Sequence, residues 1–168
     1  SLSKKSMSMA TSAPVIVEGA NSFITPEARL RLQEAGVVVL RDASANKCGV
    51  ISSSYEIIGN LLLDEREFLA HKAQYVKDVL EILERRAVDE ARLIFRRHRE
   101  AGGKRPFTEI SEALSGEINR HKARLFAWFE AHPETRGQQP WEAALLAHLP
   151  RLVRETPAFR DRVSRLPS

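Results

Sequence analysis

The sequence predicts an α/β unit, in which two parallel strands flank one helix, followed by a region that is mostly α-helical. Two short apolar runs rich in β-branched residues lie on either side of a capped helix between residues 14 and 40. Beyond residue 49, apolar positions recur at spacings of three and four, which is the period of a helix. The succession of strand, helix and strand favours a parallel βαβ arrangement.

The first elements are short and carry clear start and stop signals. Residues 14–17 (PVIV) have the length and β-branched content of a strand. Thr25 can cap the next helix, Pro26 suits its first position, and Gly36 ends it. Residues 37–40 (VVVL) form a second strand that is apolar on both faces, as strands buried in a parallel sheet are. We expect a right-handed crossover between the two strands.

A polar loop at residues 42–47 is expected to lead into a helix that starts at about Gly49. A second helix starts at Asp64, with Glu67 three residues later as a capping box, and ends at Gly102-Gly103. This long helix carries two apolar stripes and therefore needs neighbours on two sides. The main stripe consists of Leu69, Ala73, Val76, Leu80, Leu83, Ala87, Ala91 and Ile94, and the second of Phe68, Tyr75, Val79 and Ile82.

The rest of the chain also reads as helix. A helix that opens at Thr108 has one apolar face, made of Ile110, Leu114, Ile118, His121, Leu125 and Trp128. Pro133 and Gly137 close it, and two short helices follow over about 141–149 and 152–163. The simplest arrangement for this region is a pair of antiparallel helices that pack along each other.

Composition excludes several classes of protein. No run of about 18 apolar residues occurs, so we expect no membrane span, and the polar residues 1–13 read as a disordered arm or linker. A single cysteine, Cys48, fits a reducing cytoplasm. The five histidines lack metal-ligand spacing, so no metal is expected. Residues 85–105 are basic, but a solvated helix end explains them, and we expect no nucleic-acid partner.

Two loops carry the residues that point to chemistry, because ligands of open α/β sheets bind outside the carboxyl ends of the strands. Gly19-Ala20-Asn21 follows the first strand, and Asn46 lies in the loop after the second. Small residues let a ligand approach the backbone, and carboxamides both donate and accept hydrogen bonds. Ser52-Ser53-Ser54 lies near a helix start, where hydroxyls and free N–H groups suit a carboxylate. The alternative is that these asparagines and serines only cap or turn the chain.

Two strings give a resemblance to a known family. VEGANSFITPEARLRL (17–32) and DASANKCGVISSSYE (42–56) resemble glutamate dehydrogenases, and specifically the large NAD-specific branch. The resemblance is close over about residues 14–65. It implies that residues 14–63 are the C-terminal part of an NAD-binding Rossmann-like domain, with residues 64–168 as a helical C-terminal region. The fold class is thus an α/β remnant of a Rossmann-like domain followed by helices.

The resemblance also implies roles for single residues. Asn21, with Gly19 and Ala20 beside it, corresponds to the family asparagine near the nicotinamide ribose, and Asn46 to the one that meets the nicotinamide amide. Ser53 corresponds to the serine that binds the substrate α-carboxylate; Ser52 or Ser54 takes this role if the register differs by one. The family's catalytic lysine and aspartate lie upstream in another domain, so no catalytic residue is expected here. Cys48 replaces a family glycine, and Ile51 a threonine.

No G-x-G-x-x-G turn for the cofactor pyrophosphate occurs in the 168 residues. We therefore interpret the chain as a fragment of an enzyme that oxidises L-glutamate to 2-oxoglutarate and ammonia. Its expected partners are the remainder of that enzyme and further copies in a homo-oligomer. The alternative is a helical oligomerisation or regulatory module without catalytic duty. A basic helical domain that binds nucleic acid is a third, weaker option.

Overall fold

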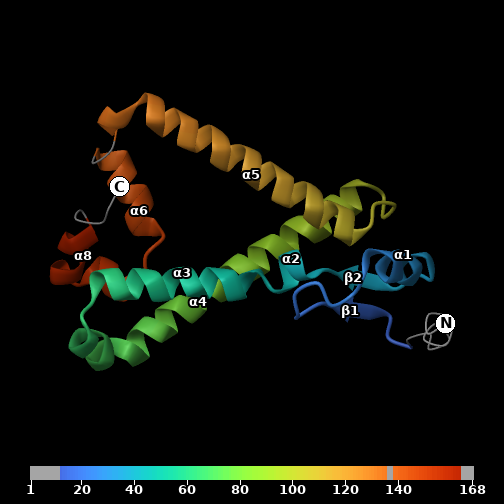
Figure 1. Ribbon diagram of the computed structural model, residues 1–168, viewed down its shortest axis with the longest axis horizontal. Helices are drawn as coiled ribbons and strands as arrows, with labels where there is room; N and C mark the ends of the chain where they lie inside the picture. Colours follow the sequence, from blue (N-terminus) through green and yellow to red (C-terminus); the bar gives the residue numbers. More distant parts are fainter. Residues whose placement is uncertain (1–11, 136–137, 164–168) are drawn as a thin grey trace. The chain divides into compact units, whose positions relative to one another are not determined.

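The computed structural model describes residues 12–135 and 138–163, which form mostly helix and one two-stranded parallel sheet (Figure 1). These residues divide into two compact units. The first unit contains residues 12–46 together with residues 91–114, and the second contains residues 47–90, 115–135 and 138–163. Residues 1–11, which make up most of the predicted disordered arm, lie outside the described residues.

The first unit contains the predicted βαβ arrangement. Strand β1 (Val15–Val17) pairs in parallel with β2 (Val38–Leu40), and Ile16 lies opposite Val39. Helix α1 (Pro26–Glu34) connects them, and its first turn is capped by the Thr25 hydroxyl, which accepts a hydrogen bond from the Ala28 N–H. Gly36 follows with a φ of 85°, a conformation that favours glycine at a helix end.

Burial differs between the two strands. Val39 is buried, but Val15 is 48% exposed and Val17 59% exposed. A sheet of two strands with a single connecting helix has too little structure to cover both faces of each strand. The apolar side chains of Val15 and Val17 on β1 are therefore open, whereas β2, which is predicted to be apolar on both faces, buries Val39.

The prediction of a loop at residues 42–47 is wrong. It contains a short helix, α2 (Asp42–Ala45), and α3 (Lys47–Leu62) begins at Lys47, two residues before the predicted start. The Asp42 carboxylate accepts a hydrogen bond from the Ala43 N–H. A negative charge in the first turn also interacts favourably with the helix dipole.

The helical part of the first unit is a turn between two long helices. It joins the end of α4 (Glu65–Glu100) to the start of α5 (Phe107–Ala131) through Gly102 and Gly103, which have φ values of 63° and 73°. Ile94, Ile110 and Leu114 form its buried core. The predicted end of the long helix at the two glycines is confirmed.

The second unit has the larger core, which α3, the first part of α4 and the last helices build together. Its buried residues are Tyr55, Leu62, Leu63, Tyr75, Val79, Ile82, Leu149, Val153, Phe159 and Val163. Two tyrosines tie the core together: the Tyr75 hydroxyl donates to the Tyr55 carbonyl, and the Tyr55 hydroxyl donates to the His148 carbonyl at 2.8 Å. Burial raises the pKa of Tyr75 to about 12, so its hydroxyl keeps the proton that it donates.

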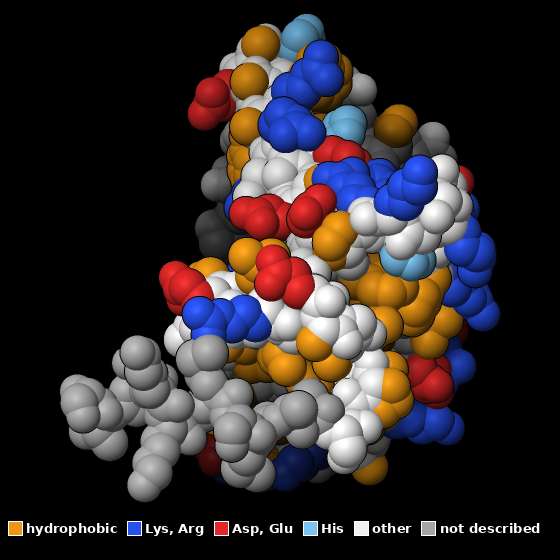
Figure 2. Space-filling model, turned by 90° about the vertical axis from the view of Figure 1, so that its right-hand side faces the viewer, with side chains coloured by type: hydrophobic (Ala, Val, Ile, Leu, Met, Phe, Trp, Pro, Cys, Tyr) orange, Lys and Arg blue, Asp and Glu red, His pale blue; other side chains and the backbone are white. Residues whose placement is uncertain are grey.

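The long helix buries the stripe that the sequence suggests as the second one. Tyr75, Val79 and Ile82 lie in the core, whereas Leu69 and Leu80 of the main predicted stripe are about 60% exposed. Helices α3, α7 and α8 pack on one side of α4, so the main stripe is open over its first half, whereas Ile94 near its end is buried. Figure 2 shows one face of the molecule, on which hydrophobic side chains reach the surface among charged ones.

The predicted packing of α4 along α5 is confined to the turn. Beyond Leu114 the apolar face of α5 is open: Ile118, Leu125 and Trp128 are each more than two-fifths exposed, and His121 is exposed. Apolar side chains of α4 and α5 that lie far from the turn are therefore not covered by the other of these two helices.

The described part of the chain ends with four short elements. The turn η1 (Pro133–Thr135) and helix α6 (Gln139–Ala147) come first. The single helix predicted at 152–163 is two, α7 (Arg151–Glu155) and α8 (Pro157–Val163), because Pro157 has no N–H to continue the first. None of the described helices is both long and apolar enough to cross a membrane.

The capping box of α4 makes stability depend on pH. The Glu67 N–H donates to the Asp64 carboxylate at 2.8 Å, and the Asp64 N–H donates to the Glu67 carboxylate at 3.0 Å. The Arg162 guanidinium donates two further bonds to the Glu67 carboxylate at 2.6 and 2.7 Å. The Arg162 bonds, followed by the Asp64 N–H, lower the pKa of Glu67 from 4.5 to about 2. Because the folded pKa is the lower one, this contribution is complete above about pH 4.5 and is lost as the pH falls toward 2.

We predict that Glu67→Gln lowers the free energy of unfolding at neutral pH and that the gap to the wild type closes in acid. Denaturant titrations from about pH 6 to about pH 2.5 measure the gap. Glu65→Gln, in the same helical turn, is the control and should show a smaller gap with little pH dependence. A gap for Glu67→Gln that stays constant over this range would contradict the assignment.

Candidate functional site

The loops that follow β1 and β2 meet at one edge of the sheet. The parallel register places the ends of the strands side by side, and the Glu18 N–H donates to the Leu40 carbonyl at 2.9 Å just beyond them. From these loops the Asn46 Nδ2 atom donates to the Asn21 Oδ1 atom at 2.9 Å. The structure therefore brings together the two asparagines that the sequence singles out.

The pair of amides keeps hydrogen-bonding capacity for a ligand. Their mutual bond uses one N–H of Asn46 and one lone pair of Asn21, which leaves the Asn21 amino group and the Asn46 carbonyl oxygen. Within residues 12–135 and 138–163, no other residue bonds these side-chain atoms. A donor and an acceptor held next to each other match the acceptor and donor of another primary carboxamide.

A buried carboxylate holds the first loop. Glu18 is 4% exposed, and its carboxylate accepts bonds from the Arg29 guanidinium at 3.1–3.3 Å and from the Ile24 N–H at 3.2 Å. Arg29 also donates to the Ile24 carbonyl at 3.0 Å. A charge this deep is stable only when it is paired, so Glu18 ties the loop to α1. Sequence reasoning missed this role; the signal was an acid at the strand end ahead of an arginine in the next helix.

A second carboxylate joins the two loops. The Asp42 Oδ2 atom accepts from the Ser22 N–H at 2.8 Å, and Oδ1 accepts from the Ala43 N–H at 2.7 Å. The Ser22 bond is the largest cause of a pKa of Asp42 below its usual range, with Ala43, Arg41 and Arg29 acting in the same direction. Asp42 also lies next to Asn21 in space, because Ser22 is the residue after it. The sequence indicated only that Asp42 starts a loop.

The backbone beside the amide pair is open. Ser22 has a φ of 53°, so the chain turns sharply after Asn21. Gly19 and Ala20 are exposed, and a Cβ built on Gly19 would meet no heavy atom within 4 Å. A ligand therefore has access to this stretch, as small residues there suggest.

Ser53 lies in the second unit, on α3. Because α3 starts at Lys47, Ser53 lies beyond its first turn, and the expectation that the serines supply free N–H groups at a helix start is wrong. The Ser53 hydroxyl is exposed and donates to the Gly49 carbonyl over a long 3.4 Å, while Ser52 donates to the same carbonyl at 2.8 Å. Ser54 donates to the Val50 carbonyl at 3.5 Å. Of the two bonds to Gly49, that of Ser53 is the easier to exchange for a ligand.

The neighbours of Asn46 along the chain have structural roles. Lys47 Nζ forms an ion pair with Glu90 at 2.7 Å, and the Cys48 thiol donates to the Leu83 carbonyl at 3.6 Å. Cys48 belongs to α3 and has no positive φ, so this position does not require the glycine that it replaces. In the described part of the chain, no group of three or more His, Cys, Asp or Glu residues is placed to hold a metal ion.

Comparisons with known proteins point in one direction. The family model for glutamate/leucine/phenylalanine/valine dehydrogenases matches residues 1–102. The chain is 42% identical over 114 residues to the NAD-specific glutamate dehydrogenase of Neurospora crassa. This alignment covers 61% of the chain and 11% of that relative. It is 43% identical over 114 residues to the probable NAD-specific glutamate dehydrogenase of Schizosaccharomyces pombe (61% and 10%).

A third relative, glutamate dehydrogenase 2 of Dictyostelium discoideum, is 40% identical over 117 residues, which are 63% of the chain and 11% of that protein. The matched part of the chain thus spans about a tenth of the length of these relatives. No solved structure matches the chain significantly.

We predict that Asp42→Ala loosens the loop that carries Asn21 and leaves the second unit intact. The change removes two charge-assisted bonds, each worth about 1.5–3 kcal/mol, of which the exposed Ser22 N–H can recover part from water. Hydrogen exchange at the Ser22 and Ala43 amides should speed up, while exchange across α3 and α4 should not. Glu112→Ala is the control, since among the described residues Glu112 pairs with Arg41 alone. Unchanged exchange at Ser22 would rule out this role for Asp42.

Proposed function

Because the chain belongs to the glutamate/leucine/phenylalanine/valine dehydrogenase family, we propose that it is part of an NAD-dependent glutamate dehydrogenase. The parent enzyme would oxidise L-glutamate to 2-oxoglutarate and ammonia. The names of the relatives support this substrate, and those of the Neurospora and Schizosaccharomyces proteins support NAD as the cofactor. In this proposal residues 14–63 are the C-terminal part of a Rossmann-like NAD-binding domain, and residues 64–168 are its helical continuation.

The hydrogen bond between Asn46 and Asn21 carries the proposal. It joins two amides at the carboxyl edge of a parallel sheet, which is where such sheets bind cofactors. The donor and acceptor left over on the pair suit the carboxamide of nicotinamide, and the open backbone at Gly19 and Ala20 leaves room for the adjoining sugar. Bound NAD supplies the hydride acceptor, and the amide pair orients the nicotinamide.

The glutamate contact assigned to this chain is Ser53. Its hydroxyl can turn from the long bond to Gly49 and donate to the substrate α-carboxylate. Neither Lys47 nor Cys48 takes part in the reaction in this proposal, because the pair with Glu90 and the bond to Leu83 engage them. The pyrophosphate contacts and the catalytic groups then belong to the remainder of the parent enzyme, which is the principal partner of this chain.

The exposed apolar side of α4 supports a second role, in assembly. Leu69, Val76 and Leu80 follow one another at helical spacing and are each more than two-fifths exposed. Ile118, Leu125 and Trp128 form a similar row on α5. Rows of exposed large side chains are a feature of surfaces that bind other protein elements. We therefore propose that the helical region also makes subunit contacts in a homo-oligomer.

We predict that Asn46→Ala in the full-length parent slows hydride transfer more than it weakens NAD binding. A lost hydrogen bond of about 0.5–1.5 kcal/mol, together with a misplaced nicotinamide, should lower kcat by roughly tenfold or more. The Kd for NAD should rise much less, since adenine and pyrophosphate contacts remain. Asn119→Ala on exposed α5 is the matched control and should alter neither value. Equal loss of kcat and of NAD affinity would place Asn46 elsewhere on the cofactor.

We predict that Ser53→Ala lowers kcat/KM for glutamate by roughly 10- to 100-fold, the range expected for a bond to a charged group. The Kd for NAD should stay the same. Ser52→Ala and Ser54→Ala are the matched comparisons, because both hydroxyls lie on the same helix and donate to nearby carbonyls. A normal kcat/KM for Ser53→Ala would refute the assignment, and a loss in either neighbour instead would move it by one residue.

We predict that the 168-residue chain alone self-associates and does not oxidise glutamate. The open edge of β1 and the exposed rows on α4 and α5 should bring copies together at high concentration. Sedimentation measures the association, and Leu80→Glu should weaken it, whereas Glu84→Gln on the same helix should not. A strictly monomeric chain at high concentration would contradict the exposed rows as contact surfaces. Measurable glutamate oxidation would contradict the fragment interpretation.

A further inference from the structure

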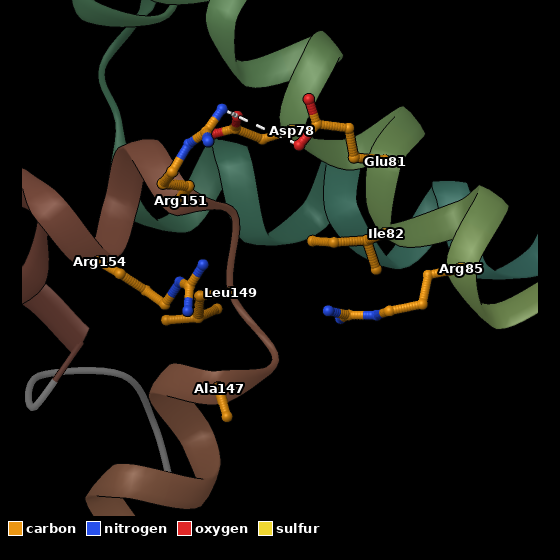
Figure 3. A pocket seen from close by; sticks show the side chains of 8 residues that line it. All are labelled: Asp78, Glu81, Ile82, Arg85, Ala147, Leu149, Arg151 and Arg154. Atoms are coloured by element: carbon orange, nitrogen blue, oxygen red, sulfur yellow. Dashed lines mark hydrogen bonds and ion pairs between the residues drawn. The ribbon is translucent and has the colours of Figure 1, made fainter.

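The second unit contains a small pocket that has no part in the proposed reaction. It has a volume of about 120 Å³ and lies between α4 and the segment that runs from the end of α6 into α7 (Figure 3). Its apolar lining comes from Ile82 and Leu149, which are 8% and 2% exposed and belong to the core of the unit. Three arginines and two acids make up most of the remaining wall.

One wall of the pocket is fixed by a buried carboxylate. Asp78 is 2% exposed and accepts bonds from Gln74 at 2.7 Å, from the Leu152 N–H at 2.7 Å and from Arg151 at 3.3 Å. These bonds hold the start of α7 against α4. Because the apolar lining is part of the core and Asp78 and Arg151 are bonded, this part of the pocket is formed before any ligand binds.

The charges in the pocket are not balanced. Arg151 is engaged with Asp78 and lies 3.9 Å from Glu81, and Figure 3 shows both interactions. Arg85 and Arg154 have no ion-pair or hydrogen-bond partner within residues 12–135 and 138–163. Figure 3 shows their guanidinium groups extending into the pocket from opposite sides. Both arginines are exposed, so an anion in this space can reach their guanidinium donors from solvent.

We propose that this pocket binds a phosphate group between Arg85 and Arg154. A guanidinium fork donates two parallel bonds to an oxoanion, and a tetrahedral phosphate offers oxygens toward two forks at once. A planar carboxylate uses both oxygens in a bidentate pair with one guanidinium group, so it pairs less well with two opposed guanidinium groups. The volume lies well below the roughly 300–1,000 Å³ of pockets that enclose whole drug-sized molecules. The ligand is therefore inorganic phosphate, or a phosphate ester whose organic part extends into solvent.

Calorimetric titration of the full chain with inorganic phosphate, glycerol phosphate and acetate at constant ionic strength tests the proposal. Both phosphates should saturate one site, and acetate should bind at least about tenfold more weakly. Tighter binding of glycerol phosphate than of inorganic phosphate would identify an ester as the ligand, and the reverse order would identify free phosphate. Absence of saturable binding by either phosphate, or equal binding of acetate, would overturn the proposal.

Matched variants locate the site. Arg85→Gln and Arg154→Gln should each weaken phosphate binding by about tenfold, because each removes charge-assisted bonds. Arg124→Gln removes the same charge from exposed α5 and should bind like the wild type. Equal weakening in all three would show a general charge effect and refute the site. In the unaltered chain, phosphate should protect Arg85 and Arg154, but not Arg124, from phenylglyoxal, and protection of none would also refute it.

Discussion

The parallel pairing of β1 with β2, which spans only three residues in each strand, determines where both loops of the candidate site lie. In a parallel ladder the carboxyl ends of neighbouring strands share one edge, so the register of Ile16 with Val39 brings Gly19–Asn21 close to Asp42–Asn46. A slip by one residue would displace one loop by about 3.3 Å and turn its strand over. The 2.9 Å bond between Asn46 and Asn21 does not survive such a shift. The amide pair therefore depends on a sheet of only two strands.

Two carboxylates compensate for the small size of that sheet. Glu18 is buried with Arg29 and fixes the first loop to α1, and Asp42 fixes the same loop to the second one through the Ser22 N–H. Each carboxylate satisfies backbone N–H groups that the loops would otherwise leave to water. The residues of the candidate site are thus held by charged bonds where apolar packing is scarce, and β1 keeps open faces. In the proposed function, those faces meet the remainder of the parent enzyme.

Local signals in the sequence predict the elements well, and tertiary contacts explain the rest. Thr25 with Pro26, the Asp64–Glu67 capping box and the positive-φ glycines at 36, 102 and 103 act within one or two turns, so they can be read from the chain. Periodicity found both stripes of α4 but not which one the core covers, because that depends on α3 and α8. The meeting of Asn21 and Asn46 followed from topology. Asp42 was missed because its role requires the left-handed backbone of Ser22.

In the proposed function Asn21 and Asn46 act as one unit, and a double-mutant cycle tests this most directly. The rate of glutamate-dependent hydride transfer would be measured for the full-length parent with Asn21→Ala, Asn46→Ala and both changes. If each amide orients the other, the double variant should be scarcely slower than the slower single variant, which gives a coupling energy of about 1 kcal/mol or more. Fully additive effects of the two changes would mean that the bond between the amides has no part in the function.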